Sequence, residues 1–137
     1  MNRKGAPDPT VIDTLTKFND FLENISVSKL VVVDLHREWC GPATAIIPFW
    51  NKCWTDLSDV ETRLEVCTMC LETINDKELS DLVAKGCEVK LDKQGCKPTF
   101  ILLRSGQIVA TVDGLNTAVL GMMMDIHLPK IKKKDEE

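Results

Sequence analysis

The stretch VVVDLHREWCGPA, residues 31–43, decides how this chain folds. Its first half belongs to the apolar run KLVVVDL, residues 29–35, which does not alternate with polar residues and is typical of a strand buried on both faces. Its second half is the turn WCGPA, residues 39–43, in which Pro42 suits the first turn of a helix. The stretch therefore predicts a buried strand, a turn that carries Cys40, and a helix behind it.

The chain on both sides of this stretch alternates between helices and strands. Before it, apolar residues at three- and four-residue spacing predict an amphipathic helix over residues 14–25, with a short strand near Val11. After it, helices are predicted at 46–57, 76–86 and 116–127, and strands at 63–71, 97–103 and 107–114. This order implies an α/β fold with a central mixed β-sheet of four or five strands and helices on both faces.

The helix predicted at 46–57 contains a proline. Its apolar positions, among them Trp50 and Cys53, form one stripe that is expected to face the core. Pro48 lies inside this helix, where proline removes a backbone hydrogen bond and its ring clashes with the preceding turn. We therefore expect the helix to be kinked at Pro48.

Size and charge limit the possible functions. The 137 residues predict a single domain at 10–128, with a loose leader at 1–9 and a charged tail at 129–137. The net charge of −4 and the lack of a basic face argue against nucleic acid as a partner. No apolar run reaches the roughly eighteen residues of a membrane helix, and the N-terminus lacks a secretory signal. We expect a cytoplasmic protein whose six cysteines are reduced.

These features together resemble the thioredoxin family over about residues 10–128. Residues 31–43 match the family's strand, buried aspartate and active-site turn, KPTF (97–100) matches the segment whose proline lies against the active cysteine, and SGQIVATVDG (105–114) matches the final hairpin. The resemblance implies the thioredoxin fold, with Cys40 at the position of the nucleophilic thiol. It also implies a partner-binding face that contains Trp39, Gly41, Pro42, Lys97, Pro98 and Gly114.

The chain departs from the family at Ala43, where the second, resolving cysteine is expected. A dithiol enzyme attacks a substrate disulfide with its first thiolate and releases itself with the second. With Ala43, a mixed disulfide on Cys40 would wait for an outside thiol, so turnover is not expected. The amides and dipole at a helix N-terminus would still favour a thiolate at Cys40, and the reactivity of this thiol stays open.

Asp34 matches the aspartate that accepts a proton during the resolving step in the family. The resemblance implies that this role is vestigial here, because the resolving cysteine is absent. An ionised carboxylate in an apolar interior is destabilising by on the order of several kcal/mol, so burial is expected to raise the pKa of Asp34. The family's charged residue on the next strand is replaced by Thr68 or Met69. His36 either packs as a wall residue or tunes Cys40.

Two groups of sulfur-containing residues suggest a ligand site, and neither is expected to form one. Cys67 and Cys70 lie three residues apart on a predicted strand, so they point to opposite faces and can share neither a disulfide nor a zinc ion. Met122, Met123 and Met124 are expected to pack within the last helix, although an exposed methionine can serve as an adaptable contact. We therefore expect no cofactor and no metal.

An insertion at 88–96 lengthens the connection that leads to Pro98. Longer surface loops are tolerated at little thermodynamic cost, so the insertion is compatible with the fold. It ends at Cys96, the remaining thiol that is expected near Cys40. Whether Cys96 pairs with Cys40 or with another chain stays open.

Two classes of function are compatible with these residues. The first is a non-enzymatic interaction subunit, because the chain is most similar to the thioredoxin-like light chains of axonemal outer-arm dynein and to the thioredoxin module of ciliary nucleoside-diphosphate-kinase proteins. VVVDLHREWCGP and the charged end after IHLPKI carry this similarity, which implies a cilium axoneme location and docking on a dynein heavy-chain tail beside neighbouring subunits. The alternative is a monothiol redox protein that forms mixed disulfides through Cys40.

Overall fold

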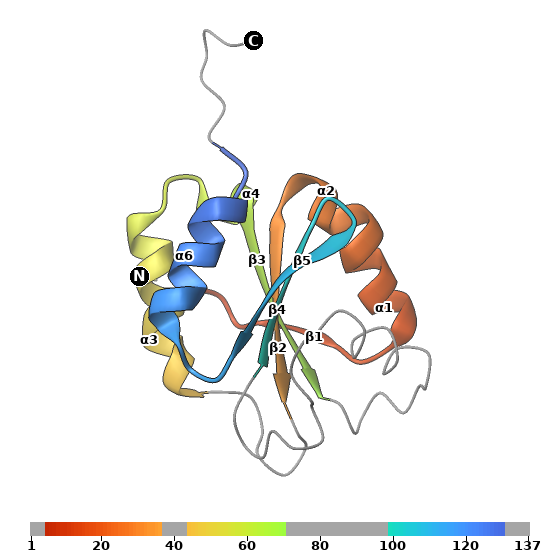
Figure 1. Ribbon diagram of the computed structural model, residues 1–137, viewed down its shortest axis with the longest axis horizontal. Coiled ribbons are helices and arrows are strands. Elements are labelled where there is room, and N and C mark those ends of the chain that lie inside the picture. Colours follow the sequence, from red (N-terminus) through yellow and green to blue (C-terminus); the bar gives the residue numbers. More distant parts are fainter. Residues whose placement is uncertain (1–4, 37–43, 71–98, 131–137) are drawn as a thin grey trace, which may run out of the picture.

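The computed structural model describes residues 5–36, 44–70 and 99–130 (Figure 1). Within these residues, five strands form one mixed sheet in the order β1-β3-β2-β4-β5. They are β1 (Thr10–Ile12), β2 (Leu30–His36), β3 (Leu64–Cys70), β4 (Thr99–Arg104) and β5 (Gln107–Asp113). The first three strands run parallel, β4 is antiparallel to β2, and β5 is antiparallel to β4. The predicted mixed sheet is confirmed, with five strands.

Helices cover both faces of this sheet, as the sequence predicts (Figure 1). One layer consists of α1 (Leu15–Asp20), the π-helical segment η1 (Phe21–Ile25) and α2 (Ser26–Ser28). The other contains the 3₁₀ turn η2 (Thr44–Ile46), α3 (Ile47–Asp56), α4 (Val60–Arg63) and α6 (Thr117–His127). The helix predicted at 76–86 lies outside the described residues. No described helix has the length and apolar character that crossing a membrane requires.

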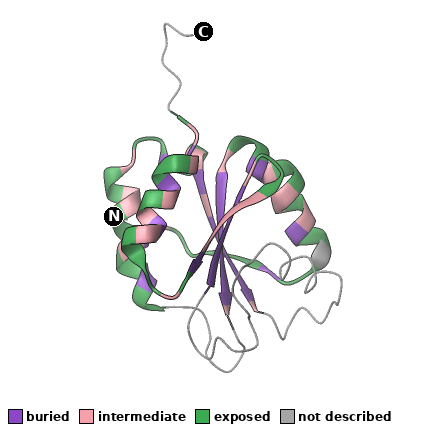
Figure 2. Ribbon diagram, viewed as in Figure 1, coloured by how far each residue is buried: buried purple, intermediate pink, exposed green. Residues whose placement is uncertain are grey.

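Strand β2 lies at the centre of the sheet, and its residues Leu30 to Leu35 are buried (Figure 2). Val31 and Val33 pack with Phe18 on the side of α1. Val32 packs with Trp50 on the side of α3 and α6. Full burial of each such side chain stabilises the fold by about 1.5–3 kcal/mol. Because both faces of β2 are packed, apolar residues are favoured at every position, and the strand shows no alternation of apolar and polar residues.

The first helix starts where the sequence predicts. Thr14 adopts an extended conformation, and its hydroxyl oxygen accepts a hydrogen bond of 3.1 Å from the amide of Lys17. This capping satisfies an amide that the first helical turn leaves without a partner. Phe18 is fully buried, and Leu22 and Ile25 pack against the same core. The change to π-helical geometry at Phe21 is a feature that the apolar spacing did not indicate.

The expectation for Pro48 is wrong in one respect. The chain forms the 3₁₀ turn η2 up to Ile46, and α3 starts at Ile47, so Pro48 lies in the first turn of α3 and not in its interior. Amides of the first turn have no acceptor within their own helix. Pro48 therefore removes no hydrogen bond from α3, and it separates the 3₁₀ turn from the α-helix.

The predicted hairpin has a two-residue turn between Arg104 and Gln107, which pair in register. Ser105 and Gly106 both have positive φ angles, 56° and 78°. Positive φ at both central positions defines a type I′ turn, whose twist matches that of the two strands. The amide of Ser105 donates to the carbonyl of Ser26 at 2.7 Å, which attaches the hairpin to α2.

The described part of the predicted leader, residues 5–9, contacts the domain. The amide of Ala6 donates a hydrogen bond of 2.9 Å to Oδ1 of Asn51 on α3. Ala6 also packs against the core on the α3 side of the sheet. Ala6 therefore lies against α3.

Candidate functional site

Four strand ends meet at one edge of the sheet. His36, the last residue of β2, is in register with Cys70, the last residue of β3. Thr99, the first residue of β4, is in register with Asp113, the last residue of β5. We call this the C-terminal edge. In parallel-sheet proteins, ligands bind beyond the carboxyl ends of the strands, so this edge is the first candidate for a site.

The residues that the resemblance assigns to a site adjoin this edge in the sequence. Residues 37–43 directly follow His36, and Pro98 directly precedes Thr99. Asp34 and Gly114 are the assigned residues that the structure describes. Those that lie outside the described residues are Trp39, Cys40, Gly41, Pro42, Ala43, Cys96, Lys97 and Pro98. Their assignment remains a prediction.

Asp34 is buried near the C-terminal edge, with 5% of its surface exposed. Its neighbours in register are Thr68 on β3 and Phe100 on β4. Of the two residues that could replace the family's charged partner, Thr68 is the one beside Asp34. Met69 is fully buried in the core on the other side of the sheet, because successive residues of a strand point to opposite faces.

His36 is held by the neighbouring strand. Its Nδ1 and the hydroxyl of Thr68 share a hydrogen bond of 3.1 Å. The Thr68 hydroxyl also lies 3.5 Å from the backbone carbonyl oxygen of Asp34. This contact fixes the half-buried imidazole against β3, as expected for a wall residue. The relation of His36 to Cys40 lies outside the described residues.

Gly114 directly follows β5 at the C-terminal edge. Its φ angle is 77°, a conformation that residues with a side chain rarely adopt. A Cβ atom at this position would meet no atom within 4 Å. The backbone conformation, and not crowding, therefore favours glycine here. The next residue, Leu115, is 46% exposed and places an apolar side chain near this edge. The sequence did not indicate Leu115 as a candidate for the site.

Replacement of Asp34 is expected to stabilise the protein. The carboxyl group lies on the face of the sheet that is packed with Val32, Phe100 and other apolar residues, where a charge is poorly solvated. We expect Asp34→Asn and Asp34→Leu to raise the free energy of unfolding by about 1 kcal/mol or more, measured by urea denaturation. Should both variants be clearly less stable, the carboxylate has a stabilising hydrogen-bonded role instead.

The described cysteines are placed as structural thiols. Cys67 is fully buried, and burial raises the pKa of its thiol. Cys70 is half-buried three residues further along β3, so the two thiols point to opposite faces, as predicted. Burial, with the nearby carboxylates of Asp56 and Asp125, raises the pKa of Cys53 to about 11. Among the described residues, no group of His, Cys, Asp and Glu is arranged to hold a metal ion.

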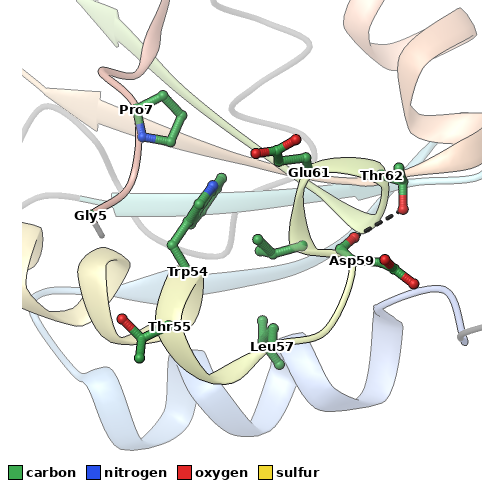
Figure 3. Close-up of a pocket in the computed structure, with 9 residues that line it drawn as sticks. Gly5, Pro7, Trp54, Thr55, Leu57, Asp59, Glu61 and Thr62 are labelled. Atoms are coloured by element: carbon green, nitrogen blue, oxygen red, sulfur yellow. Dashed lines mark hydrogen bonds between the residues drawn. The ribbon is translucent and has the colours of Figure 1, made fainter. Parts of the chain in front are cut away.

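A hollow of about 740 Å³ lies beside Trp54, at the end of α3 (Figure 3). Pro7 of the leader and Glu61 of α4 contribute to its lining. The hydroxyl of Thr62 donates to the backbone carbonyl of Asp59 at 2.9 Å and holds the turn that closes the hollow. The sequence did not predict it, because the leader and α4 are far apart in the chain. Its polar side chains include the carboxylates of Asp59 and Glu61 and the hydroxyls of Thr55 and Thr62.

Comparison with known proteins agrees with this architecture. The family model for thioredoxin matches residues 10–125. Thioredoxin of Homo sapiens is 36% identical over 105 residues, which cover 77% of this chain and 85% of the human protein. The crystal structure of a thioredoxin from Malassezia sympodialis superposes with a TM-score of 0.63 at 21% identity, over 90% of this chain and 93% of that one.

A second relative comes from a motor complex. The flagellar outer-arm dynein 16 kDa light chain of Chlamydomonas reinhardtii is 32% identical over 95 residues, 69% of this chain. The match covers 54% of that protein, so this chain spans about half the length of the light chain. The family model matches nearly the whole folded domain, and solved thioredoxins have the same fold. The chain therefore belongs to the thioredoxin family.

Proposed function

We propose that this chain is a thioredoxin-like interaction subunit that has lost disulfide turnover, and that it is a light chain of ciliary outer-arm dynein docked on a heavy-chain tail. One observation carries the loss of turnover: Ala43 stands where the family has its resolving cysteine. Trp39, Pro42 and Pro98 of the binding face are nevertheless present. A binding face that persists without the second thiol supports a role in docking.

The assignment to dynein is supported by the similarity to the Chlamydomonas outer-arm light chain. Because this chain spans about half of that protein, the location in the cilium and the heavy-chain partner belong to the proposal. Its partners in this proposal are proteins, namely a dynein heavy chain and neighbouring subunits.

Exposed apolar side chains near the C-terminal edge support the docking role. Leu115 follows Gly114 and is 46% exposed, and Ile47 at the start of α3 is 49% exposed. Exposed apolar groups of this kind are typical of protein interfaces. In this proposal the partner lies across this edge and contacts Trp39 and Pro98.

The proposal is tested by isolating the native complex. An affinity-tagged chain expressed in ciliated cells is expected to co-purify with an outer-arm dynein heavy chain in a fixed ratio, measured by quantitative mass spectrometry. A tagged chain that enters the cilium and remains free of heavy chain in a size-exclusion separation would contradict it. Tagged cytoplasmic thioredoxin, which has the same fold and both cysteines, serves as the control.

The monothiol alternative is favoured by a different observation, the presence of Cys40 at the position of the family's nucleophile. In that role the Cys40 thiolate attacks a substrate disulfide, forms a mixed disulfide and displaces one substrate thiolate. Glutathione then attacks the substrate sulfur of the mixed disulfide, which releases the Cys40 thiolate and leaves a substrate–glutathione disulfide. Alkylation of Cys40 over a range of pH separates the two functions. A thiol with a lowered pKa and fast alkylation supports the enzyme, and a slow thiol supports the subunit.

A further inference from the structure

Helices α3 and α6 leave a groove of about 670 Å³ between them, on the side of the helices that faces away from the sheet. Phe49 and Cys53 of α3 line one wall. Gly121, Met122 and Ile126 of α6 line the other. The two helices lie next to each other in the same layer (Figure 1). The groove therefore belongs to the helical layer and is separate from the C-terminal edge of the sheet.

Gly121 keeps the groove open. It lies in the middle of α6 (Thr117–His127), where glycine makes a helix less stable than alanine does. A Cβ atom at this position would lie 3.8 Å from ring atoms of Phe49, an ordinary van der Waals distance. Core packing therefore does not exclude alanine. A large side chain at position 121 would instead fill the space between the helices.

The α6 wall of the groove carries exposed apolar side chains. Met122 is 52% exposed and Ile126 is 64% exposed, and their spacing of four residues places them on one face of the helix. Met124 points into the core and is 2% exposed. Met122 is therefore an exposed methionine that can serve as an adaptable contact, whereas Met124 packs in the core. Neighbouring exposed apolar groups of this kind mark interaction surfaces.

The groove also has a negative charge. Three charged residues line it, Lys52, Asp56 and Asp125. Lys52 Nζ pairs with Asp56 Oδ2 at 2.8 Å, whereas Asp125 makes no ion pair with any residue in the described part of the chain. After burial, the charges of Asp56 and Asp125 are the next causes of the raised pKa of Cys53. A thiol on the groove wall thus lies in the field of both carboxylates.

We propose that this groove binds an amphipathic helix of a partner protein, with apolar residues at positions i, i+4 and i+7 and a Lys or Arg that pairs with Asp125. An apolar groove between two helices with a carboxylate on its wall fits the helix-in-groove mode of recognition. The 11 residues of α6 span about 16 Å, which matches about three turns of a bound helix. A second copy of the chain fits less well, because each copy has a net charge of −4.

Two synthetic helical peptides test the proposal, each about fifteen residues long and stapled to hold the helix. Both carry leucine at i, i+4 and i+7, and they differ only in having lysine or glutamate beside this stripe. The lysine peptide is expected to bind at least about tenfold more tightly at low salt, measured by calorimetry. It should shift the amide NMR signals of α3 and α6 and leave those of β1 and α2 unchanged.

Exposed side chains provide variants that keep the fold intact. Ile126→Asp is expected to weaken binding of the lysine peptide at least about tenfold, and Asp125→Lys to reverse the preference between the two peptides. Val27→Asp is the matched control, because Val27 is 60% exposed on the opposite helical layer. It should leave both affinities unchanged. Circular dichroism of all three variants checks that they are folded.

Four results would overturn the proposal. The first three are the absence of peptide binding, equal affinity for the two peptides, and shifts of amide NMR signals outside α3 and α6. The fourth is self-association of the chain in analytical sedimentation that Ile126→Asp abolishes. That result would mean that a second copy of the chain occupies the groove. Binding that appears only after removal of residues 131–137 would mean that the chain's own tail occupies the groove. None of these results bears on docking at the C-terminal edge, which depends on Trp39 and is measured with the dynein partner.

Discussion

With thioredoxin reductase and NADPH as the source of electrons, this chain is expected to reduce insulin at least about a thousandfold more slowly than a dithiol thioredoxin. The physical reason is the effective concentration of the resolving thiol. A second cysteine one helical turn away attacks the mixed disulfide intramolecularly, which is worth several orders of magnitude over a thiol in solution. Ala43 cannot do this, and a mixed disulfide on Cys40 would persist.

The matched variants are Ala43→Cys and Ala43→Ser. Ala43→Cys supplies a thiol and is expected to restore measurable turnover. Ala43→Ser introduces a side chain of nearly the same size that has a hydroxyl in place of the thiol, and it should leave the chain inactive. Insulin reduction by the native chain at the rate of a thioredoxin would refute the proposed loss of activity. If Ala43→Cys remains inactive although it is folded, the turn at 39–43 does not retain the family's geometry.

Docking through the C-terminal edge leads to the second large effect. Truncating a buried aromatic anchor at an interface typically lowers the binding free energy by about 2 kcal/mol or more, which is about a thirtyfold loss of affinity. Trp39→Ala is therefore expected to weaken binding to the dynein partner at least about thirtyfold. Cys40→Ser changes one atom and should have almost no effect if the contact is non-covalent.

Quantitative co-purification of both variants with the native partner is the measurement. Trp54→Ala provides a control, because Trp54 is a half-buried tryptophan that lines the hollow at the far end of α3. The docking model fails if Cys40→Ser releases the partner while Trp39→Ala retains it. That outcome would mean a disulfide bond to the partner, and the monothiol alternative would then apply.

Much of the fold could be predicted because its evidence is local. The unbroken apolar run of β2 reflects burial on both faces, and Ser105-Gly106 is a turn because glycine accepts a positive φ. Each of these features depends on a few neighbouring residues, and each is confirmed. The proline in the 46–57 helix was misjudged because the change from a 3₁₀ turn to α3 leaves no periodic pattern.

The sequence proposes the candidate site as a set of residues, and it says little about how they are arranged. The order of the motifs in the sequence identified Asp34 and Gly114, and the described strands bring both to one edge of the sheet. Which residue faces Asp34 was undecided between Thr68 and Met69, because adjacent strand residues differ only in the face to which they point. The register of β2 with β3 decides for Thr68.

The sequence by itself determined the thioredoxin fold, the family, and the absence of a cysteine at position 43, since these follow from local patterns and from residue identity. The tertiary structure alone decided which side chains remain exposed. Met122 and Met124 look equivalent in an apolar helix, but α3 and the sheet cover only one side of α6. Burial depends on what packs against a residue, and the groove beside Gly121 exists only once two helices from distant parts of the chain lie together.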